Sequence, residues 1–220
     1  MKYIIMAGGR YEHWEKPRQL CEIKGKTLIQ RTSDLLKSAG VSEDDIFVST
    51  NIESIRIHCS EISVNWLWMA NNNWVVHRPG HSSGYWCDAF WTLNEPACYL
   101  MGDVVFSPDA IKTIVETETD DIEFFASAPP FAKEYPKRWA EPLAFKVVNQ
   151  QHLREAQAEV HRLADQKRFR RAPIAWELWQ VIKQTPINKI DYTNYTAIND
   201  YSCDIDVADD VKKFDNIVKD

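Results

Sequence analysis

Cationic side chains gather directly behind a glycine turn near the N-terminus. The apolar run from Tyr3 to Met6 breaks into Ala7-Gly8-Gly9, and Arg10, Lys16 and Arg18 follow in the next loop. Glycines let backbone N–H groups approach an anion closely because no Cβ stands in the way, and the basic side chains add charge. A glycine pair alone is weak evidence, but together with these cations it predicts a polyphosphate-binding site.

Aspartates that follow apolar runs form a second set of chemical groups. Asp103 lies in the apolar stretch 99–106, where an ionised carboxylate is costly unless it is paired or metal-bound. Mg²⁺ prefers one or two carboxylates together with phosphate oxygens and water, so we interpret Asp103 as a metal ligand rather than as a turn residue before Pro108. Asp204 and Asp206 would share one face of an extended segment, and the sequence does not choose between them.

Composition limits the class of protein. The 220 residues suffice for one α/β domain, and the net charge of −6 argues against a general nucleic-acid binder. Five widely spaced cysteines without a CxxC pair predict reduced thiols and no zinc signature, and the six histidines show no metal-ligand spacing. With no signal peptide and no segment long enough to span a bilayer, we expect a cytoplasmic protein.

Strand and helix signals alternate in short units along the whole chain. Alternation of this kind predicts a mostly parallel sheet with helices on both faces, in a single α/β domain over 1–220. Ligands in such sheets bind beyond the carboxyl ends of the strands, where the glycine turn and Asp103 are expected. The pattern predicts strands at 3–6, 46–50, 99–106, 122–128 and 143–148, and helices at 27–39, 82–94, 108–116, 151–165, around 176–182 and at 208–218.

Several motifs in this order resemble one enzyme family. Ala7-Gly8-Gly9, Pro17-Arg18-Gln19-Leu20 and Gly25-Lys26-Thr27-Leu28-Ile29 resemble the opening of nucleotidyltransferases of the sugar-nucleotide pyrophosphorylase and cytidylyltransferase type. The likeness continues in Leu100-Met101-Gly102-Asp103 and in Asp204-Ile205-Asp206. It implies a three-layer α/β/α, Rossmann-like (GT-A-like) fold. It also implies Mg²⁺-dependent transfer from a nucleoside triphosphate to a phosphorylated acceptor, with release of pyrophosphate.

The resemblance also implies roles for single residues. Gly8 and Gly9 would contact phosphate, Arg18 would replace the family's lysine and stabilise the transition state, and Asp103 with Asp204 or Asp206 would hold the metal. Tyr11 and His13 depart from the family's Gly-x-Arg loop. The predicted nucleotide-binding residues are Ala7, Gly8, Gly9, Arg10, Lys16, Arg18, Ser82, Ser83 and Gly84.

The sequence indicates the acceptor-binding residues less specifically than the nucleotide-binding ones. The nucleotide-binding part is expected over about 1–110, the acceptor-binding part over about 111–205 and a C-terminal helix over 206–220. Arg138, Trp139 and Lys146 are candidates for the acceptor, although each alone could be ordinary surface or core. We expect CTP or another pyrimidine triphosphate as donor and a sugar phosphate or small alkyl phosphate as acceptor. Nucleic acid and membrane are not expected as partners, and homo-oligomerisation is left open.

Two other functions compete with this interpretation. A glycosyltransferase of related fold would show a DxD motif, whereas Gly102-Asp103-Val104 has a single aspartate. A diverged, non-catalytic nucleotide-binding domain would account for the departures at Tyr11, His13 and Arg18.

Overall fold

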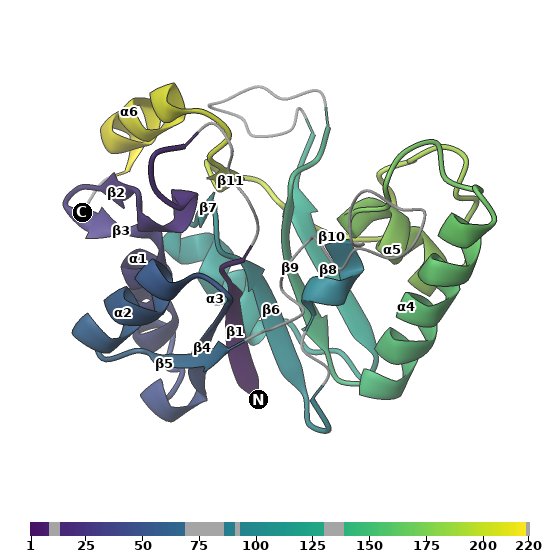
Figure 1. The fold of residues 1–220 in the computed structure, drawn as a ribbon, viewed down its shortest axis with the longest axis horizontal. Helices are drawn as coiled ribbons and strands as arrows, with labels where there is room; N and C mark the ends of the chain where they lie inside the picture. The colour runs from purple at the N-terminus through teal and green to yellow at the C-terminus, as the bar shows by residue number, and fades with distance from the viewer. Residues whose placement is uncertain (9–13, 69–85, 91–92, 130–138, 219–220) are drawn as a thin grey trace.

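Seven strands form the central sheet of the computed structural model, in the order β10-β8-β9-β6-β1-β4-β5 (Figure 1). The structure describes residues 1–8, 14–68, 86–90, 93–129 and 139–218. The strands span Lys2–Met6 (β1), Ile46–Thr50 (β4), Asn65–Trp68 (β5), Ala97–Met101 (β6), Ile122–Ser127 (β8), Pro142–Val147 (β9) and Thr196–Ile198 (β10).

One strand of the sheet runs against the others. β9 pairs antiparallel with both β6 and β8, while β1, β4, β5 and β6 pair parallel with one another and β10 pairs parallel with β8. β1 and β6 lie at the centre of the sheet, and every residue of β6 is buried. Strands covered on both faces need continuous apolar runs, which is how both segments read in the sequence. The predicted mostly parallel sheet is confirmed.

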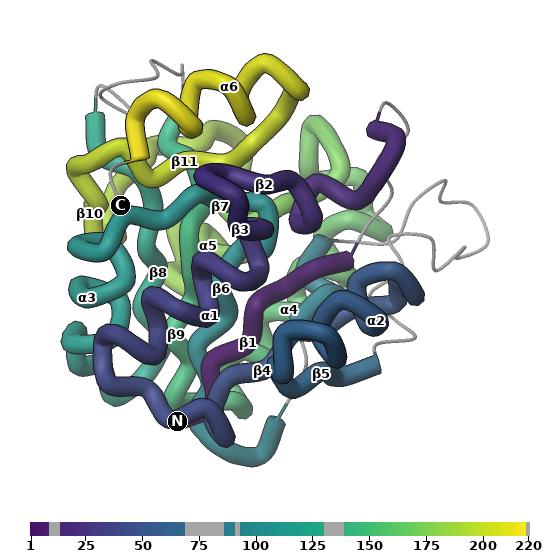
Figure 2. The backbone as a smooth tube through the Cα atoms, turned by 90° about the vertical axis from the view of Figure 1, so that its left-hand side faces the viewer, coloured from purple at the N-terminus to yellow at the C-terminus, as the bar shows by residue number. Residues whose placement is uncertain are grey.

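Helices cover both faces and complete three layers. Figures 1 and 2 show α1, α2 and α3 on one face and α4 and α5 on the other, with α6 above the carboxyl edge. Thr27, Ser107 and Asn149 cap α1, α3 and α4 by accepting a backbone N–H, as such residues commonly do at helix starts. The helices span Leu28–Ser38 (α1), Glu53–Glu61 (α2), Pro108–Glu116 (α3), Gln150–Asp165 (α4), Ala175–Ile182 (α5) and Ala208–Ile217 (α6).

The predicted helix at 82–94 is wrong over the residues that the structure describes there. Only the short 3₁₀ turn η3 forms, over Trp86–Ala89. Side chains of α4 hold this segment instead: Gln157 donates to Cys87 O at 2.8 Å, a carbonyl that a helix through Asn94 would have used, and Arg154 donates to Leu93 O at 3.5 Å. The segment is therefore held against α4 by tertiary hydrogen bonds.

The predicted strand at 99–106 is also divided in two. β6 ends at Met101, and after Gly102 and Asp103 the chain enters β7 (Val104–Val105). β7 leaves the main sheet and pairs antiparallel with β11 (Cys203–Asp204). The break turns Asp103 out of the strand and into the space beyond the carboxyl edge.

Two apolar clusters stabilise the fold. The larger one includes Trp176 and Trp179 of α5, each 2% exposed. The smaller one joins α6 and the hairpin of β2 (Glu22–Ile23) and β3 (Lys26–Thr27) to the β7–β11 ribbon. Its buried members are Ile23, Leu28, Val105, Cys203, Ile205, Phe214 and Val218.

Candidate active site

The backbones of β1 and β6 come unusually close where the two strands end. Gly102 N donates to Met6 O at 3.0 Å, and a Cβ added at Gly102 would lie only 2.2 Å from that oxygen. Only glycine allows this approach, since a real Cβ would force the backbone apart. Ala7, which is buried, donates its N–H to Ser49 O at 2.8 Å. The glycine turn therefore starts directly beside the residue that precedes Asp103.

Arg18 connects three segments that are distant in the sequence. It begins the 3₁₀ turn η1 (Arg18–Leu20), and its Nη2 lies 3.1 Å from Asp103 Oδ2. Its Nη1 donates to Ile205 O at 2.6 Å and lies 3.5 Å from Asp206 Oδ1. The Arg18 and Asp103 side chains are 18% and 23% exposed, so solvent screens this ion pair only in part. A planar guanidinium suits such a fork better than an ammonium.

The β7–β11 ribbon places the C-terminal aspartates next to Asp103. Asp204 pairs with Val104, and Ile205 N donates to Asp103 O at 2.9 Å. Asp206 then precedes α6, whose Asp210 is fully buried and accepts from Asp206 N at 2.9 Å. Asp210 also accepts from Val207 N at 3.0 Å, and it therefore fixes the backbone that carries Asp206.

A cluster of three carboxylates forms at this edge. Glu141, Asp204 and Asp206 each offer an oxygen, and these atoms lie within 4.8 Å of one another. Glu141 is only 6% exposed, Trp139 Nε1 donates to it, and Glu141 N donates to Ser127 Oγ at 2.8 Å. Sequence reasoning missed Glu141. Its signal was an acidic residue directly before the apolar strand β9, which runs back from the edge where the other strands end.

The donor set of this cluster suits a hard divalent cation. Carboxylate oxygens are the ligands that Mg²⁺ prefers, and three carboxylates around one point repel one another unless a cation lies among them. The predicted ligands Asp204 and Asp206 belong to this cluster, while Asp103 faces Arg18 beside it.

The structure brings together part of the predicted nucleotide-binding set. Ala7, Gly8 and Arg18 lie around the carboxyl edge, and Lys16 is exposed. Burial raises the pKa of the Cys21 thiol, while the charges of Lys16 and Arg18 act in the opposite direction, so both cations lie within electrostatic reach of it. The remaining predicted residues, Gly9, Arg10, Ser82, Ser83 and Gly84, lie outside the described residues, as do Tyr11 and His13.

Of the predicted acceptor residues, only Trp139 lies at this site in the part of the chain that the structure describes. Trp139 is 46% exposed and lies beside Glu141, at the carboxylate cluster. Lys146 is 4% exposed, pairs with Cys98 near the start of β6, and donates to Val115 O and Thr117 O at the end of α3. Burial lowers its pKa. Lys146 therefore points to the opposite end of the sheet and is not brought to this site. Arg138 lies outside the described residues.

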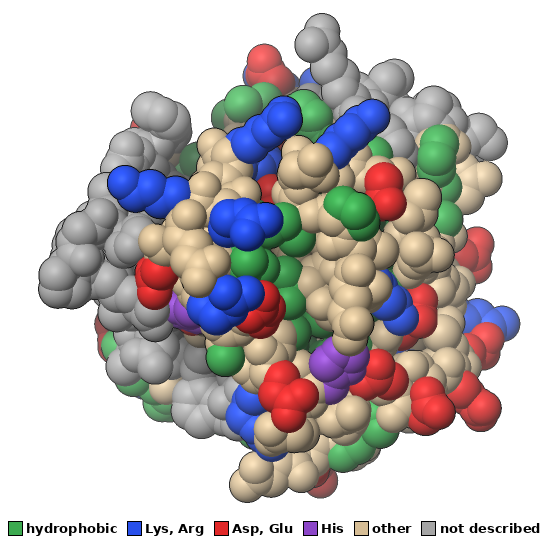
Figure 3. Space-filling model, turned by 90° about the vertical axis from the view of Figure 1, so that its right-hand side faces the viewer, with side chains coloured by type: hydrophobic (Ala, Val, Ile, Leu, Met, Phe, Trp, Pro, Cys, Tyr) green, Lys and Arg blue, Asp and Glu red, His purple; other side chains and the backbone are tan. Residues whose placement is uncertain are grey.

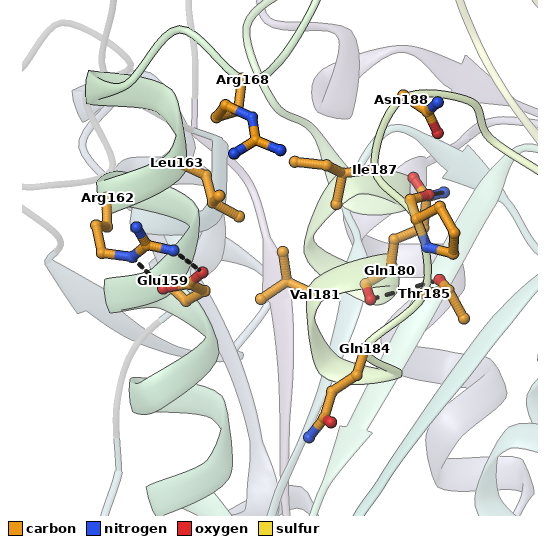
Figure 4. A pocket seen from close by; sticks show the side chains of 11 residues that line it. Glu159, Arg162, Leu163, Arg168, Gln180, Val181, Gln184, Thr185, Ile187 and Asn188 are labelled. Atoms are coloured by element: carbon orange, nitrogen blue, oxygen red, sulfur yellow. Dashed lines mark hydrogen bonds and ion pairs between the residues drawn. The ribbon is translucent and has the colours of Figure 1, made fainter.

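A separate cavity of about 610 Å³ opens between α4 and α5. Figure 4 shows Leu163 on α4 across from Ile187 of the loop after α5, with Val181 on α5 below and between them. Arg162 is paired there with Glu159, and Lys, Arg, Asp and Glu side chains are interspersed over this face (Figure 3). None of the residues gathered around Arg18 lines this cavity.

A family model matches most of the chain. Residues 3–175 match the model of the MobA-like NTP transferase domain family. No curated protein matches the chain significantly. Across the described residues, every helix is too short or too polar to cross a lipid bilayer.

Solved structures of similar fold cover nearly the whole chain. A protein of Bacillus anthracis described as a glucose-1-phosphate thymidylyltransferase, in complex with sucrose, is 15% identical with a TM-score of 0.63, over 98% of this chain and 94% of that one. HddC of Yersinia pseudotuberculosis, complexed with GMP-PN, is 13% identical (TM-score 0.56, 99% of each chain). The 4-diphosphocytidyl-2C-methyl-D-erythritol synthase of Anaerococcus prevotii is 11% identical (TM-score 0.57, 98% and 96%). At these identities the likeness establishes the fold.

Proposed function

The chain belongs to the MobA-like NTP transferase domain family and is a nucleotidyltransferase, and we propose that it acts on a sugar phosphate or small alkyl phosphate. The donor is a pyrimidine nucleoside triphosphate, with CTP as the first candidate, and the products are a nucleotide-linked acceptor and pyrophosphate. The observation that carries this proposal is the meeting of Arg18, Asp103 and Asp206 beyond the strand ends, beside the glycine turn. Five free, buried cysteines support a reducing, cytosolic setting.

Arg18 is the residue proposed to stabilise the transition state. The acceptor phosphate is already anionic at neutral pH, so the reaction needs no general base. The protein must align that oxygen with the α-phosphorus and neutralise the charge that moves onto pyrophosphate. Arg18 has five N–H donors. Asp103 and the Ile205 carbonyl hold its guanidinium beyond the strand ends.

The carboxylates are the proposed metal ligands. Asp204 and Asp206 would hold Mg²⁺ together with Asp103 or Glu141, and the ion would supply positive charge to the phosphates. Asp103 has a second task in this proposal, because its ion pair orients Arg18. Asp210 keeps Asp206 in place through the two backbone N–H groups that it accepts.

Trp139 is the proposed contact for the acceptor. Its indole is nearly half exposed and its N–H is directed to Glu141, so one ring face can pack on an apolar part of the acceptor. A Trp139→Ala variant should raise KM for the acceptor and leave KM for the nucleotide unchanged. Lys146→Met, at the other end of the sheet, is the matched control and should change neither constant.

A coupled pyrophosphate assay tests the proposed function. Purified protein is incubated with Mg²⁺, with CTP, UTP, dTTP, ATP or GTP in turn, and with a panel of phosphorylated sugars and alkyl phosphates. We expect pyrophosphate release with one pyrimidine triphosphate and one acceptor class, and its loss in Asp103→Ala with an unchanged circular dichroism spectrum.

Two other outcomes would favour the competing functions. Thermal stabilisation by a nucleoside triphosphate without pyrophosphate release would favour a non-catalytic binding domain. Hydrolysis of UDP-sugars would favour a glycosyltransferase. Activity retained in Asp103→Ala would contradict both roles given to Asp103, and a purine preference would contradict the proposed donor.

A further inference from the structure

A second cluster of metal-binding side chains lies on the α4 side of the sheet. Cys87, Asp88 and His161 each offer one ligand atom, and these atoms lie within 4.8 Å of one another. His161 Nε2 is 2.5 Å from Asp88 Oδ1, and Cys87 is 1% exposed. None of the three belongs to the carboxylate cluster or contacts Arg18 through a bond described above.

Hydrogen bonds from α4 hold the two parts of this cluster together, η3 with Cys87 and Asp88 and α4 with His161. His161 and Gln157 lie one turn apart on α4, and Gln157 Nε2 donates to Cys87 O at 2.8 Å. Arg154 and Gln150, further down the same face of α4, donate to Leu93 O and Glu95 O. Four polar side chains along one face of α4 thus face the segment 87–95, and three of them donate hydrogen bonds to its backbone. The fourth, His161, is the one nearest the C-terminus of α4 and contacts Asp88.

We propose that Cys87, Asp88 and His161 form a zinc site that ties η3 to α4. One thiolate, one imidazole and one carboxylate is a mixed set that favours Zn²⁺ over Mg²⁺, which takes oxygen ligands alone. Three protein ligands leave the fourth tetrahedral position to water. This site is separate from the proposed nucleotidyl transfer, and it gives the chain a second, softer metal centre.

The spacing of the ligand atoms is compatible with one ion after a small adjustment. Two tetrahedral ligands about 2.0–2.1 Å from zinc lie about 3.3 Å apart. The His161–Asp88 hydrogen bond is shorter than that, so the pair must open by less than an ångström when the ion takes the place of the shared proton. The Zn–S bond forms as the Cys87 S–H proton leaves for solvent, so binding releases at least one proton and involves no change of oxidation state.

Cobalt substitution tests this site directly. Full-length protein is stripped of metal with a chelator and titrated with Co²⁺, whose thiolate complexes absorb by charge transfer in the near ultraviolet. We expect one equivalent to produce this band and Zn²⁺ to displace it. Cys87→Ser should abolish the band, and His161→Gln should weaken Co²⁺ affinity by more than about tenfold, since loss of an outer-shell partner alone costs 10–100-fold.

The controls separate this site from other thiols and from the carboxylate cluster. Cys59→Ser changes another buried thiol, on α2, and should keep the band. Should Cys87→Ser fail to fold by circular dichroism, His161→Gln provides the same test at a partly exposed side chain. The proposal is overturned if Co²⁺ binds without a charge-transfer band, if the band survives in the folded Cys87 variant, if the His161 variant binds Co²⁺ as tightly as the unmodified protein, or if stoichiometric Zn²⁺ does not raise the Tm of the stripped protein.

Discussion

Arg18 Nη2 lies 3.1 Å from Asp103 Oδ2, although 85 positions separate the two residues in the sequence (103 − 18). The contact joins the loop behind the glycine turn to the end of β6. The same guanidinium reaches Ile205 O and Asp206, so one side chain connects the N-terminal, central and C-terminal parts of the site. A change at Arg18 should therefore affect both chemistry and the placement of the carboxylates.

Arg18→Ala should lower kcat by about 10²–10³-fold, the usual cost of removing one group that stabilises developing negative charge. Arg18→Lys should retain part of the activity, because it keeps the charge but loses the planar fork. Steady-state pyrophosphate release measures both effects. Lys26→Ala, at an exposed lysine paired with Asp34, is the control and should match the unmodified enzyme. A kcat for Arg18→Ala within twofold of that enzyme would remove Arg18 from the mechanism.

Neutral isosteres of the carboxylates should weaken metal activation. Asp204→Asn, Asp206→Asn and Glu141→Gln should each raise the Mg²⁺ concentration for half-maximal activity by more than about tenfold, because even outer-shell partners contribute 10–100-fold. Asp209→Asn is the matched control, since Asp209 is exposed and paired with Lys212. Of the three, Glu141 rests on the tertiary structure alone. An unchanged Mg²⁺ requirement in Glu141→Gln, with a higher KM for the acceptor, would assign it to the acceptor instead.

Gly102→Ala should destabilise the protein strongly and abolish activity. Its Cβ would lie 2.2 Å from Met6 O, so the ends of β1 and β6 must separate and Asp103 must move. Overpacking of this kind costs about 3 kcal/mol at its upper range, which corresponds to a Tm decrease of about 6–12 °C.

Gly40→Ala is the matched control for that substitution. Gly40 has a φ of +89° but nothing within 4 Å of an added Cβ, so only the backbone conformation costs free energy, about 1–2 kcal/mol. Differential scanning calorimetry compares the two variants. A Tm for Gly102→Ala equal to or above that of Gly40→Ala would show that separating the two strand ends costs no more than the backbone strain at residue 40, and would contradict this prediction.

Stability should decline at alkaline pH because of a buried thiol. Burial raises the pKa of Cys98 from 9.0 to about 12. The unfolded chain releases this proton near pH 9 and the folded protein retains it, so the free energy of unfolding decreases as pH rises from 9 to about 12. For one thiol the loss between pH 8 and pH 10 is about 1.4 kcal/mol.

Urea unfolding of the unmodified protein and of Cys98→Ala at pH 8 and pH 10 measures this loss. The variant should be less stable at pH 8, because the substitution leaves a small cavity, but its decrease between the two pH values should be smaller. Equal decreases in both proteins would show that Cys98 does not titrate on unfolding.

Local patterns in the sequence determined most of the elements. Apolar runs predicted β1, β4, β8 and β9, and the helix predicted from Thr27 formed as α1 with Thr27 as its cap. These signals act over a few residues, so they are readable before any tertiary contact forms. The sequence did not predict that the strand breaks before Asp103, because the close contact between Gly102 and Met6 decides it. Nor did it predict that no α-helix follows Trp86, because hydrogen bonds from α4 hold that segment.

The candidate site residues also fall into those predicted from the sequence and those found only in the tertiary structure. Residue types and their order were enough to predict that a glycine turn, Arg18, Asp103 and an aspartate pair share one site, and Arg18 does contact Asp103 and Asp206. Only the tertiary structure assigned Glu141 to the carboxylates, moved Lys146 to the opposite end of the sheet, and brought Cys87 and Asp88 to His161. The physical reason is distance along the chain: a motif records neighbours in sequence, whereas charge and metal ligation depend on neighbours in space, which the sheet order and the packing of α4 decide.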